Sequence, residues 1–105
     1  ILQGAQIYKG VAIAVPSEVT GRIIAAKAAD ELLNISGVEA SIVIAPAAGG
    51  GCIASARSIG EMNMQIIMEK LGGGGNRSAA AAQLRDVDAP TAREMVLRAI
   101  DEYLG

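Results

Sequence analysis

The chain has 105 residues, of which 51% are apolar, and this is enough for the core of one small domain. It has no Phe or Trp and only two Tyr, so it lacks the aromatic surface on which single-stranded nucleic acid stacks. The net charge of −2 is spread without a basic stripe, which disfavours general attraction to a polyanion or an acidic membrane.

The start of the chain and its single cysteine bear on its context. The chain begins at Ile1 without an initiator Met and already runs into a strand-like segment, so we expect one domain over residues 1–105, cut from a longer protein. The lone Cys52 excludes an internal disulfide and suits a reducing compartment. No apolar run approaches the length of a membrane span, and the first residues do not resemble a signal peptide.

The N-terminal third predicts a strand followed by a helix. The apolar run 11–15 is rich in Val and Ile and ends at Pro16, which is typical of a strand buried on both faces. Residues 18–35 have the periodicity of an amphipathic helix, and Gly37 follows as its C-terminal stop. We expect its buried face to be formed by Ile24, Ala28, Leu32 and Ile35.

The middle of the chain predicts a hairpin and a second helix. Runs 40–45 and 51–57 are strand-like and are joined by a connection short enough for an antiparallel hairpin. Ser58 and Glu61 have the spacing of a capping box, so the next helix is predicted to begin there. Its apolar face comprises Met64, Ile67, Met68 and Leu71, and the methionines are best explained as core packing.

The C-terminal third is predicted to be mainly helical. Residues 79–82 are four alanines and favour a short helix, while residues 83–87 could add a short edge strand. Thr91 and Glu94 repeat the capping-box spacing before a final helix. Its apolar face comprises Val96, Ala99, Ile100 and Tyr103. The order of elements predicts an α/β fold, in which a two-layer mixed β-sheet packs with helices.

Four successive glycines at residues 72–75 are the first feature that could carry function. Without side chains, their backbone N–H groups can approach a phosphate closely, and the predicted helix after them would present its positive end. Asn76, Arg77 and Ser78 would lie at the rim of such a site. A tight or flexible connection explains a glycine run equally well.

Arg57 is the second feature, because it stands where a predicted strand ends, between Ser55 and Ser58. A guanidinium at a strand end can fork onto a phosphate or carboxylate in a cleft. The alternative is a surface arginine paired with a neighbour such as Glu61.

The chain contains no histidine, which removes the usual general base and a common metal ligand. The acidic residues fall on predicted helix surfaces or starts, apart from Asp86 and Asp88, which have no other ligands nearby. We therefore predict neither catalytic nor metal-ligating residues, and no activity for this chain alone.

The run SARSIGEMNMQIIMEKLGGGGNRSAAAAQL, residues 55–84, resembles the C-terminal domain associated with DHH-superfamily phosphoesterases. The helix, the glycine cluster and the alanines after it match that family's GGGH-then-AA pattern. The segment KAADELLNISGVEASIVIA, residues 27–45, is similar in particular to cyclic-di-AMP phosphodiesterases of the GdpP type. The resemblance covers nearly the whole chain from Val11 onward.

The resemblance implies a DHH-associated domain fold and a substrate-binding task. By position, it assigns substrate contacts to Arg57, Gly73, Gly74 and Gly75, with Ser55 and Ser58 as weaker candidates. This chain has Asn76 where the family usually has His; Asn can donate a hydrogen bond to phosphate but cannot carry a positive charge.

For the whole protein, the resemblance implies a manganese-dependent phosphodiesterase that hydrolyses cyclic-di-AMP to pApA. The N-terminal DHH domain of the same chain would hold two manganese ions, with no cofactor in this part. The parent would be anchored in the cell membrane with this domain on the cytoplasmic face, out of direct membrane contact, and a homodimer is possible.

Two other readings stay open. The first is the substrate-binding domain of a DHH exonuclease, oligoribonuclease or oligonucleotide phosphatase, which would bind longer oligonucleotides more tightly. The second is a non-catalytic interaction module, which would bind no free dinucleotide and would show a basic surface or an apolar patch instead.

Overall fold

The computed structural model describes residues 4–105, and within them a mixed sheet of six strands packs with three helices. In chain order the elements are β1 (Gln6–Tyr8), β2 (Val11–Ala14), α1 (Arg22–Ser36), β3 (Ala40–Pro46), β4 (Cys52–Ser58), α2 (Met64–Glu69), β5 (Gly74–Gly75), β6 (Ala79–Leu84) and α3 (Ala89–Leu104). The start of the chain at Ile1, from which we expected a longer protein, lies outside the described residues. The α/β class and the mixed sheet are confirmed.

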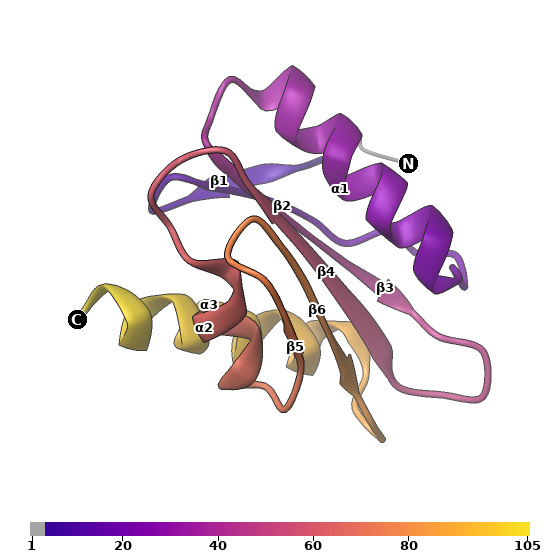
Figure 1. Cartoon of the computed structure of the whole chain (residues 1–105). Helices are drawn as coiled ribbons and strands as arrows, with labels where there is room; N and C mark the ends of the chain where they lie inside the picture. The colour runs from indigo at the N-terminus through magenta and orange to yellow at the C-terminus, as the bar shows by residue number, and fades with distance from the viewer. Residues whose placement is uncertain (1–3) are drawn as a thin grey trace.

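The strands lie side by side in the order β1-β2-β3-β4-β6-β5 (Figure 1). β2 and β3 are parallel, with α1 as the crossover between them, and every other neighbouring pair is antiparallel. Parallel neighbours need such a crossover, whereas antiparallel neighbours need only a turn. The predicted hairpin of β3 and β4 is confirmed, with Ala40 opposite Ser58 and Pro46 opposite Cys52.

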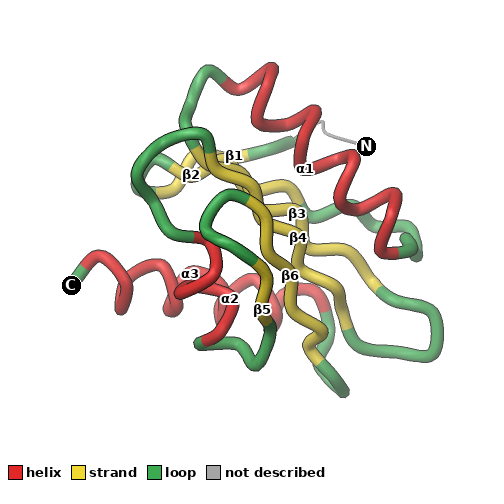
Figure 2. Tube along the Cα trace, in the orientation of Figure 1, coloured by secondary structure: helices red, strands yellow, loops and turns green. Residues whose placement is uncertain are grey.

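Helices cover both faces of the sheet (Figure 2). Because successive strand residues point to opposite faces, Val11 and Ile13 join the core under α2 and α3, while Ala12 and Ala14 contact α1. The structure therefore has three layers, one more than the two expected from the sequence. Within residues 4–105, no helix combines the length and the apolar character needed to cross a membrane.

The buried face of α1 differs from the expected one. Ala28 and Leu32 are buried as predicted, but Ile24 and Ile35 are 55% and 70% exposed. The buried face consists of Ala25, Ala28, Ala29, Leu32 and Leu33. Small alanines let the helix lie close to the sheet, which turns the bulkier isoleucines outward. The predicted stop at Gly37 is confirmed, with a left-handed φ of 76°.

Both predicted capping boxes are wrong, although both helices exist. α2 begins later than Ser58, with Asn63 as its N-cap, and the Asn63 side chain accepts a hydrogen bond from Ile66 N at 3.3 Å. The Tyr103 hydroxyl accepts a hydrogen bond from Asn63 N at 3.0 Å and so ties this start to α3. α3 begins before Thr91, because Asp88 is its N-cap. The predicted packing of Met64 and Met68 in the core is confirmed.

The alanine run after the glycines is a strand and not the predicted helix. Ala79–Leu84 forms β6, which pairs with β4 from Arg57 opposite Ala79 to Cys52 opposite Leu84. Alanine favours helices locally, but pairing on two sides and burial of Ala80 and Ala82 override that preference. The predicted edge strand at 83–87 is also corrected, because residues 83 and 84 belong to this interior strand.

The cap of α3 gives a testable pH dependence. Asp88 Oδ1 accepts a hydrogen bond from Thr91 N at 2.9 Å. The Thr91 hydroxyl, and to a smaller extent this N–H, hold the pKa of Asp88 below its ordinary value. A lowered folded-state pKa means stability that is present above the unfolded pKa of about 3.9 and lost as the pH falls through the folded pKa.

We expect Asp88→Ala to lower the thermal unfolding midpoint by several degrees at neutral pH, and Asp88→Asn, which keeps a capping oxygen, to lower it much less. As the pH falls to about 3, the advantage of the natural chain over Asp88→Asn should shrink. The measurement is thermal unfolding followed by circular dichroism. An Asp88→Ala midpoint equal to that of the natural chain at neutral pH would contradict this capping assignment.

Candidate functional site: a groove beside the glycine segment

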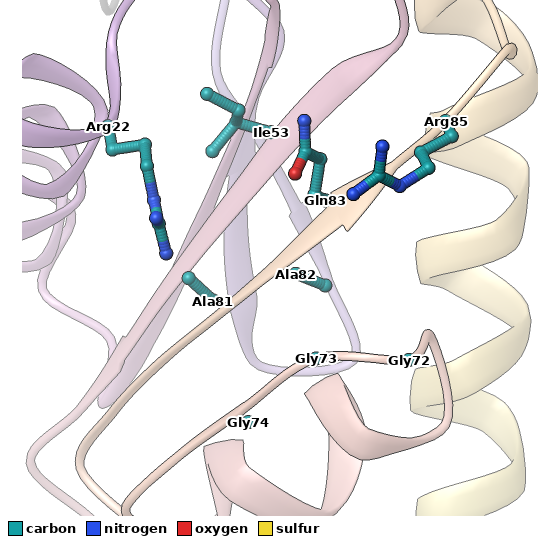
Figure 3. A pocket seen from close by; sticks show the side chains of 9 residues that line it. All are labelled: Arg22, Ile53, Gly72, Gly73, Gly74, Ala81, Ala82, Gln83 and Arg85. Atoms are coloured by element: carbon teal, nitrogen blue, oxygen red, sulfur yellow. The ribbon is translucent and has the colours of Figure 1, made fainter.

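A groove lies on the face of the sheet that α1 covers, where β4 and β6 extend beyond the helix (Figure 3). It has two adjoining lobes that share Arg22, Ile53, Gly74 and Ala81. We call the lobe of about 450 Å³ that includes Arg85 the Arg85 lobe, and the lobe of about 310 Å³ that includes Arg57 the Arg57 lobe. No Asp or Glu among the described residues lines either lobe.

Arg57 is held in place by two contacts in its lobe. Its Nε donates to Asp30 Oδ1 at 2.9 Å, and its Nη1 donates to Ala56 O at 2.8 Å. The side chain is only 18% exposed. Within residues 4–105, Nη2 donates no hydrogen bond to the protein, so its two N–H groups remain for a ligand in the groove. The ion pair that the alternative expected is thus present, but its acidic partner is Asp30 and not Glu61.

The glycine segment, residues 72–75, forms one wall of the groove, but two of its amides are already used. Gly72 N donates to Glu69 O at 3.1 Å, and Gly73 N donates to Met68 O at 2.9 Å, which closes the C-terminus of α2. Since β6 is a strand, no helix N-terminus follows the segment either. The segment therefore lets a phosphate approach the backbone closely, but it does not present a cluster of free N–H groups.

A side chain would have different consequences at Gly73 and at Gly74. A Cβ on Gly73 would lie 2.6 Å from the Cα and the Cβ of Ala82, so no side chain fits there. A Cβ on Gly74 would meet nothing within 4 Å. Gly74 is paired with Ala81, and residues opposite each other in an antiparallel pair point to the same face. Because Ala81 lines both lobes, a side chain at Gly74 would enter the groove.

Asn76 builds the turn between β5 and β6. Its Oδ1 accepts hydrogen bonds from Ser78 N at 3.0 Å, Ser78 Oγ at 3.1 Å and Ala79 N at 2.9 Å. These contacts are typical of an asparagine side chain that stabilises a turn. A histidine has no carbonyl oxygen with which to make them, so Asn76 gives this turn a local support of its own.

The other predicted contact residues are only partly brought together. Ser55 is buried and lines the Arg57 lobe with Gly74 and Gly75, whereas Ser58 accepts a hydrogen bond from Gly60 N at 3.2 Å. Arg77 donates from Nη2 to Glu61 O at 2.8 Å. Three of the predicted residues line neither lobe, namely Ser58, Asn76 and Arg77.

Three polar residues of the groove escaped the sequence reasoning: Arg22, Gln83 and Arg85. Arg22 begins α1 and reaches the groove only through the fold, so no local pattern marks it. For the other two a signal exists. Residues 79–85 read as a strand with a period of two put Gln83 and Arg85 on the same face as Ala81, and the helix assignment concealed this pattern.

The described residues show no catalytic group in the groove. Within residues 4–105, no three His, Cys, Asp or Glu side chains lie close enough together to hold a metal ion. Cys52 is buried on the opposite face of β4, and burial raises the pKa of its thiol, which keeps it protonated and unreactive. The arrangement can bind and position an anion, but it offers no general base.

Comparison with known proteins identifies relatives over nearly the whole chain. The DHHA1 domain family matches residues 8–105. The cyclic-di-AMP phosphodiesterase PdeA of Listeria monocytogenes serotype 1/2a (strain 10403S) is 46% identical over 98% of this chain and 16% of its own length. The cyclic-di-AMP phosphodiesterase GdpP of Geobacillus thermodenitrificans (strain NG80-2) is 47% identical over 90% of this chain and 15% of its own length. The chain thus spans a small part of these relatives.

Among solved structures, an exopolyphosphatase-related protein from Bacteroides fragilis superposes with a TM-score of 0.80. The match covers 97% of this chain and 32% of that protein, at 18% sequence identity. Likeness at this identity concerns the fold alone.

Proposed function

The chain belongs to the DHHA1 domain family, and from this premise we propose that it is the nucleotide-binding domain of a phosphodiesterase that hydrolyses cyclic-di-AMP. The resemblance carried by residues 55–84 is confirmed by the family match and by homology to the two cyclic-di-AMP phosphodiesterases. The activity of the whole protein is part of the proposal, since the chain spans 16% or less of these relatives.

The observation that carries the proposal is the charge of the groove. Arginines 22, 57 and 85 line it, its floor is formed by small residues and Ile53, and the described lining contains no carboxylate. Arginine matches the geometry of phosphate oxygens, and a wall of glycine lets the ligand come close to the backbone. The groove therefore suits an anionic ligand with an extended shape, such as a dinucleotide.

In this proposal the chain binds and orients the substrate and leaves hydrolysis to the rest of the parent protein. Arg57, fixed by Asp30, would donate from Nη2 to a phosphate and offset negative charge that develops during the reaction. The chemistry would come from manganese ions held by an N-terminal DHH domain, since this chain has no histidine. We also propose that the parent is anchored in the cell membrane with this domain on the cytoplasmic side.

Exposed apolar side chains close in sequence to Arg22 support contact with the proposed DHH domain. Val19, shortly before α1, is 63% exposed, and Ile23 and Ile24, in the first turn of α1, are 73% and 55% exposed. Arg22, which lines both lobes, lies between Val19 and Ile23 in the sequence. A domain that closes over the groove would cover these side chains and remove them from water. A second copy of the chain is the other proposed occupant of this surface.

The test is a titration of the isotopically labelled chain with cyclic-di-AMP and with pApA, monitored through the NMR shifts of its backbone amides. We expect shifts at residues 72–78 and at Arg57, with weak affinity because the contacts of the proposed DHH domain are absent. Arg57→Gln should weaken binding about tenfold, because it removes a charged hydrogen-bond donor.

Arg98→Gln is the matched control, since Arg98 is exposed on α3, which packs on the opposite face of the sheet. It should leave the affinity unchanged. Equal affinities of the natural chain and Arg57→Gln would argue against the proposed contact. Affinity that rises steadily with oligonucleotide length would favour the exonuclease reading, and no shifts with either ligand at millimolar concentration would favour the interaction module.

A further inference from the structure

The Arg85 lobe carries positive charge that binding at Arg57 does not use. Its polar side chains are Arg22, Gln83 and Arg85, and all three are exposed. In Figure 3, Arg22 extends from the start of α1 toward Ala81, while the guanidinium of Arg85 points toward Gln83 from the other end of the lobe. The polar groups thus surround a floor made of small and apolar side chains.

The two lobe arginines are not neutralised by the protein. Arg57 pairs with Asp30 at 2.9 Å, and Arg93 lies 3.7 Å from Glu94. Across residues 4–105, by contrast, no carboxylate oxygen lies within 4.0 Å of the guanidinium groups of Arg22 or Arg85. Two cations in a concave surface without acidic residues attract an anion from solution.

Arg57 and Arg85 lie at different positions along the groove, one in each lobe. Arg57 is opposite Ala79 in the sheet, and Arg85 follows Ala79 by six residues along β6 and its end. At about 3.3 Å per residue, the two backbones are about 20 Å apart. Each arginine therefore marks a separate position along the groove, and Arg22, which lines both lobes, lies between them.

We propose that the Arg85 lobe binds a second phosphate group of the nucleotide, so that the chain selects ligands with two phosphates over ligands with one. This inference rests on the proposed function, in which the Arg57 lobe receives the first phosphate. Arg85 contributes a charge and a fork of N–H donors, Arg22 contributes from the opposite side, and the Gln83 amide can donate to the same group or to a ribose hydroxyl.

The experiment compares two linear dinucleotides that differ only in the terminal phosphate, pApA and ApA. The affinity of the natural chain, Arg85→Gln, Arg57→Gln and Arg98→Gln is measured for both by NMR titration. Arg85→Gln should weaken pApA binding about tenfold and leave ApA binding unchanged. Arg57→Gln should weaken the binding of both ligands, and Arg98→Gln the binding of neither. Arg85 is exposed, so its variant should unfold at the same temperature as the natural chain.

Each outcome separates the inference from the proposed function. Equal losses of pApA and ApA affinity in Arg85→Gln, or no loss of either, would overturn the second phosphate position and leave nucleotide binding intact. If the natural chain binds neither ligand while folded, both the proposed function and this inference are overturned. A loss confined to pApA in Arg85→Gln, with ApA still sensitive to Arg57→Gln, supports both.

Discussion

Replacing Gly74 by leucine is expected to abolish measurable nucleotide binding while the chain stays folded. The Cβ at this position has no heavy atom within 4 Å, so the side chain costs the fold little. Gly74 shares a face with Ala81, however, and both lobes include these two residues. The leucine would occupy the point where the lobes meet and keep a phosphate away from the backbone. We expect at least about a hundredfold loss of affinity for cyclic-di-AMP and pApA.

The series Gly74→Ala, Gly74→Val and Gly74→Leu should show a loss of affinity that grows with side-chain size, measured by NMR titration. Asn34→Leu adds an equally large apolar group on the exposed face of α1 and serves as the control for leucine itself. Binding by Gly74→Leu with the affinity of the natural chain would show that the glycine segment is only a connection. The non-catalytic interaction module would then become the better explanation.

At the neighbouring position the expected result is the reverse, a loss of stability. Gly73→Ala would bring its Cβ within 2.6 Å of the Cα and the Cβ of Ala82 and into the Ala81 carbonyl oxygen. The obstacles are two backbone atoms and an alanine Cβ, so no change of rotamer relieves them, and β5 must move away from β6. We expect the free energy of unfolding to fall by about 3 kcal/mol, at the upper end of the usual cost of overpacking.

Urea unfolding of Gly73→Ala and Gly74→Ala measures this difference directly. Both variants add one methyl group to adjacent glycines, so they share every effect of the substitution on the unfolded chain. Gly74→Ala should unfold within about 0.5 kcal/mol of the natural chain. Equal stabilities of the two variants would mean that the contact between β5 and β6 is looser than described.

Much of the fold could be predicted because local and tertiary preferences agree there. β2, β3 and β4 coincide with apolar runs bounded by Pro or Gly, and α3 buries Val96, Ala99 and Ile100 as its periodicity indicates. The sequence misleads where tertiary contacts override a local preference. Four alanines, for example, form a strand because β4 lies beside them. The start of α3 was misjudged for a local reason, since Asp88 and not Thr91 is its N-cap.

The candidate site, like the fold, could be predicted only in part. Arg57 and the glycine segment were found because a strand end and a run of glycines are visible in one short stretch of sequence. Arg22 was not found, because it meets the groove only after α1 has crossed over the sheet. Arg85 was not found, because the helix expected at residues 79–82 concealed the alternation along β6. That Gly73 and Gly74 are glycine for different reasons depends on which face each presents to β6.

The short strands at the borders of the sheet have a consequence for aggregation. β1 has three residues and β5 has two, while the central strands β3 and β4 have seven each. A long, apolar edge strand would offer a row of unpaired N–H and C=O groups on which another chain could build a shared sheet. Here the longest strands, β3 and β4, lie between neighbours, and the border strands β1 and β5 are too short to offer such a row themselves. The fold thereby keeps its β-rich interior from acting as a template for fibrils.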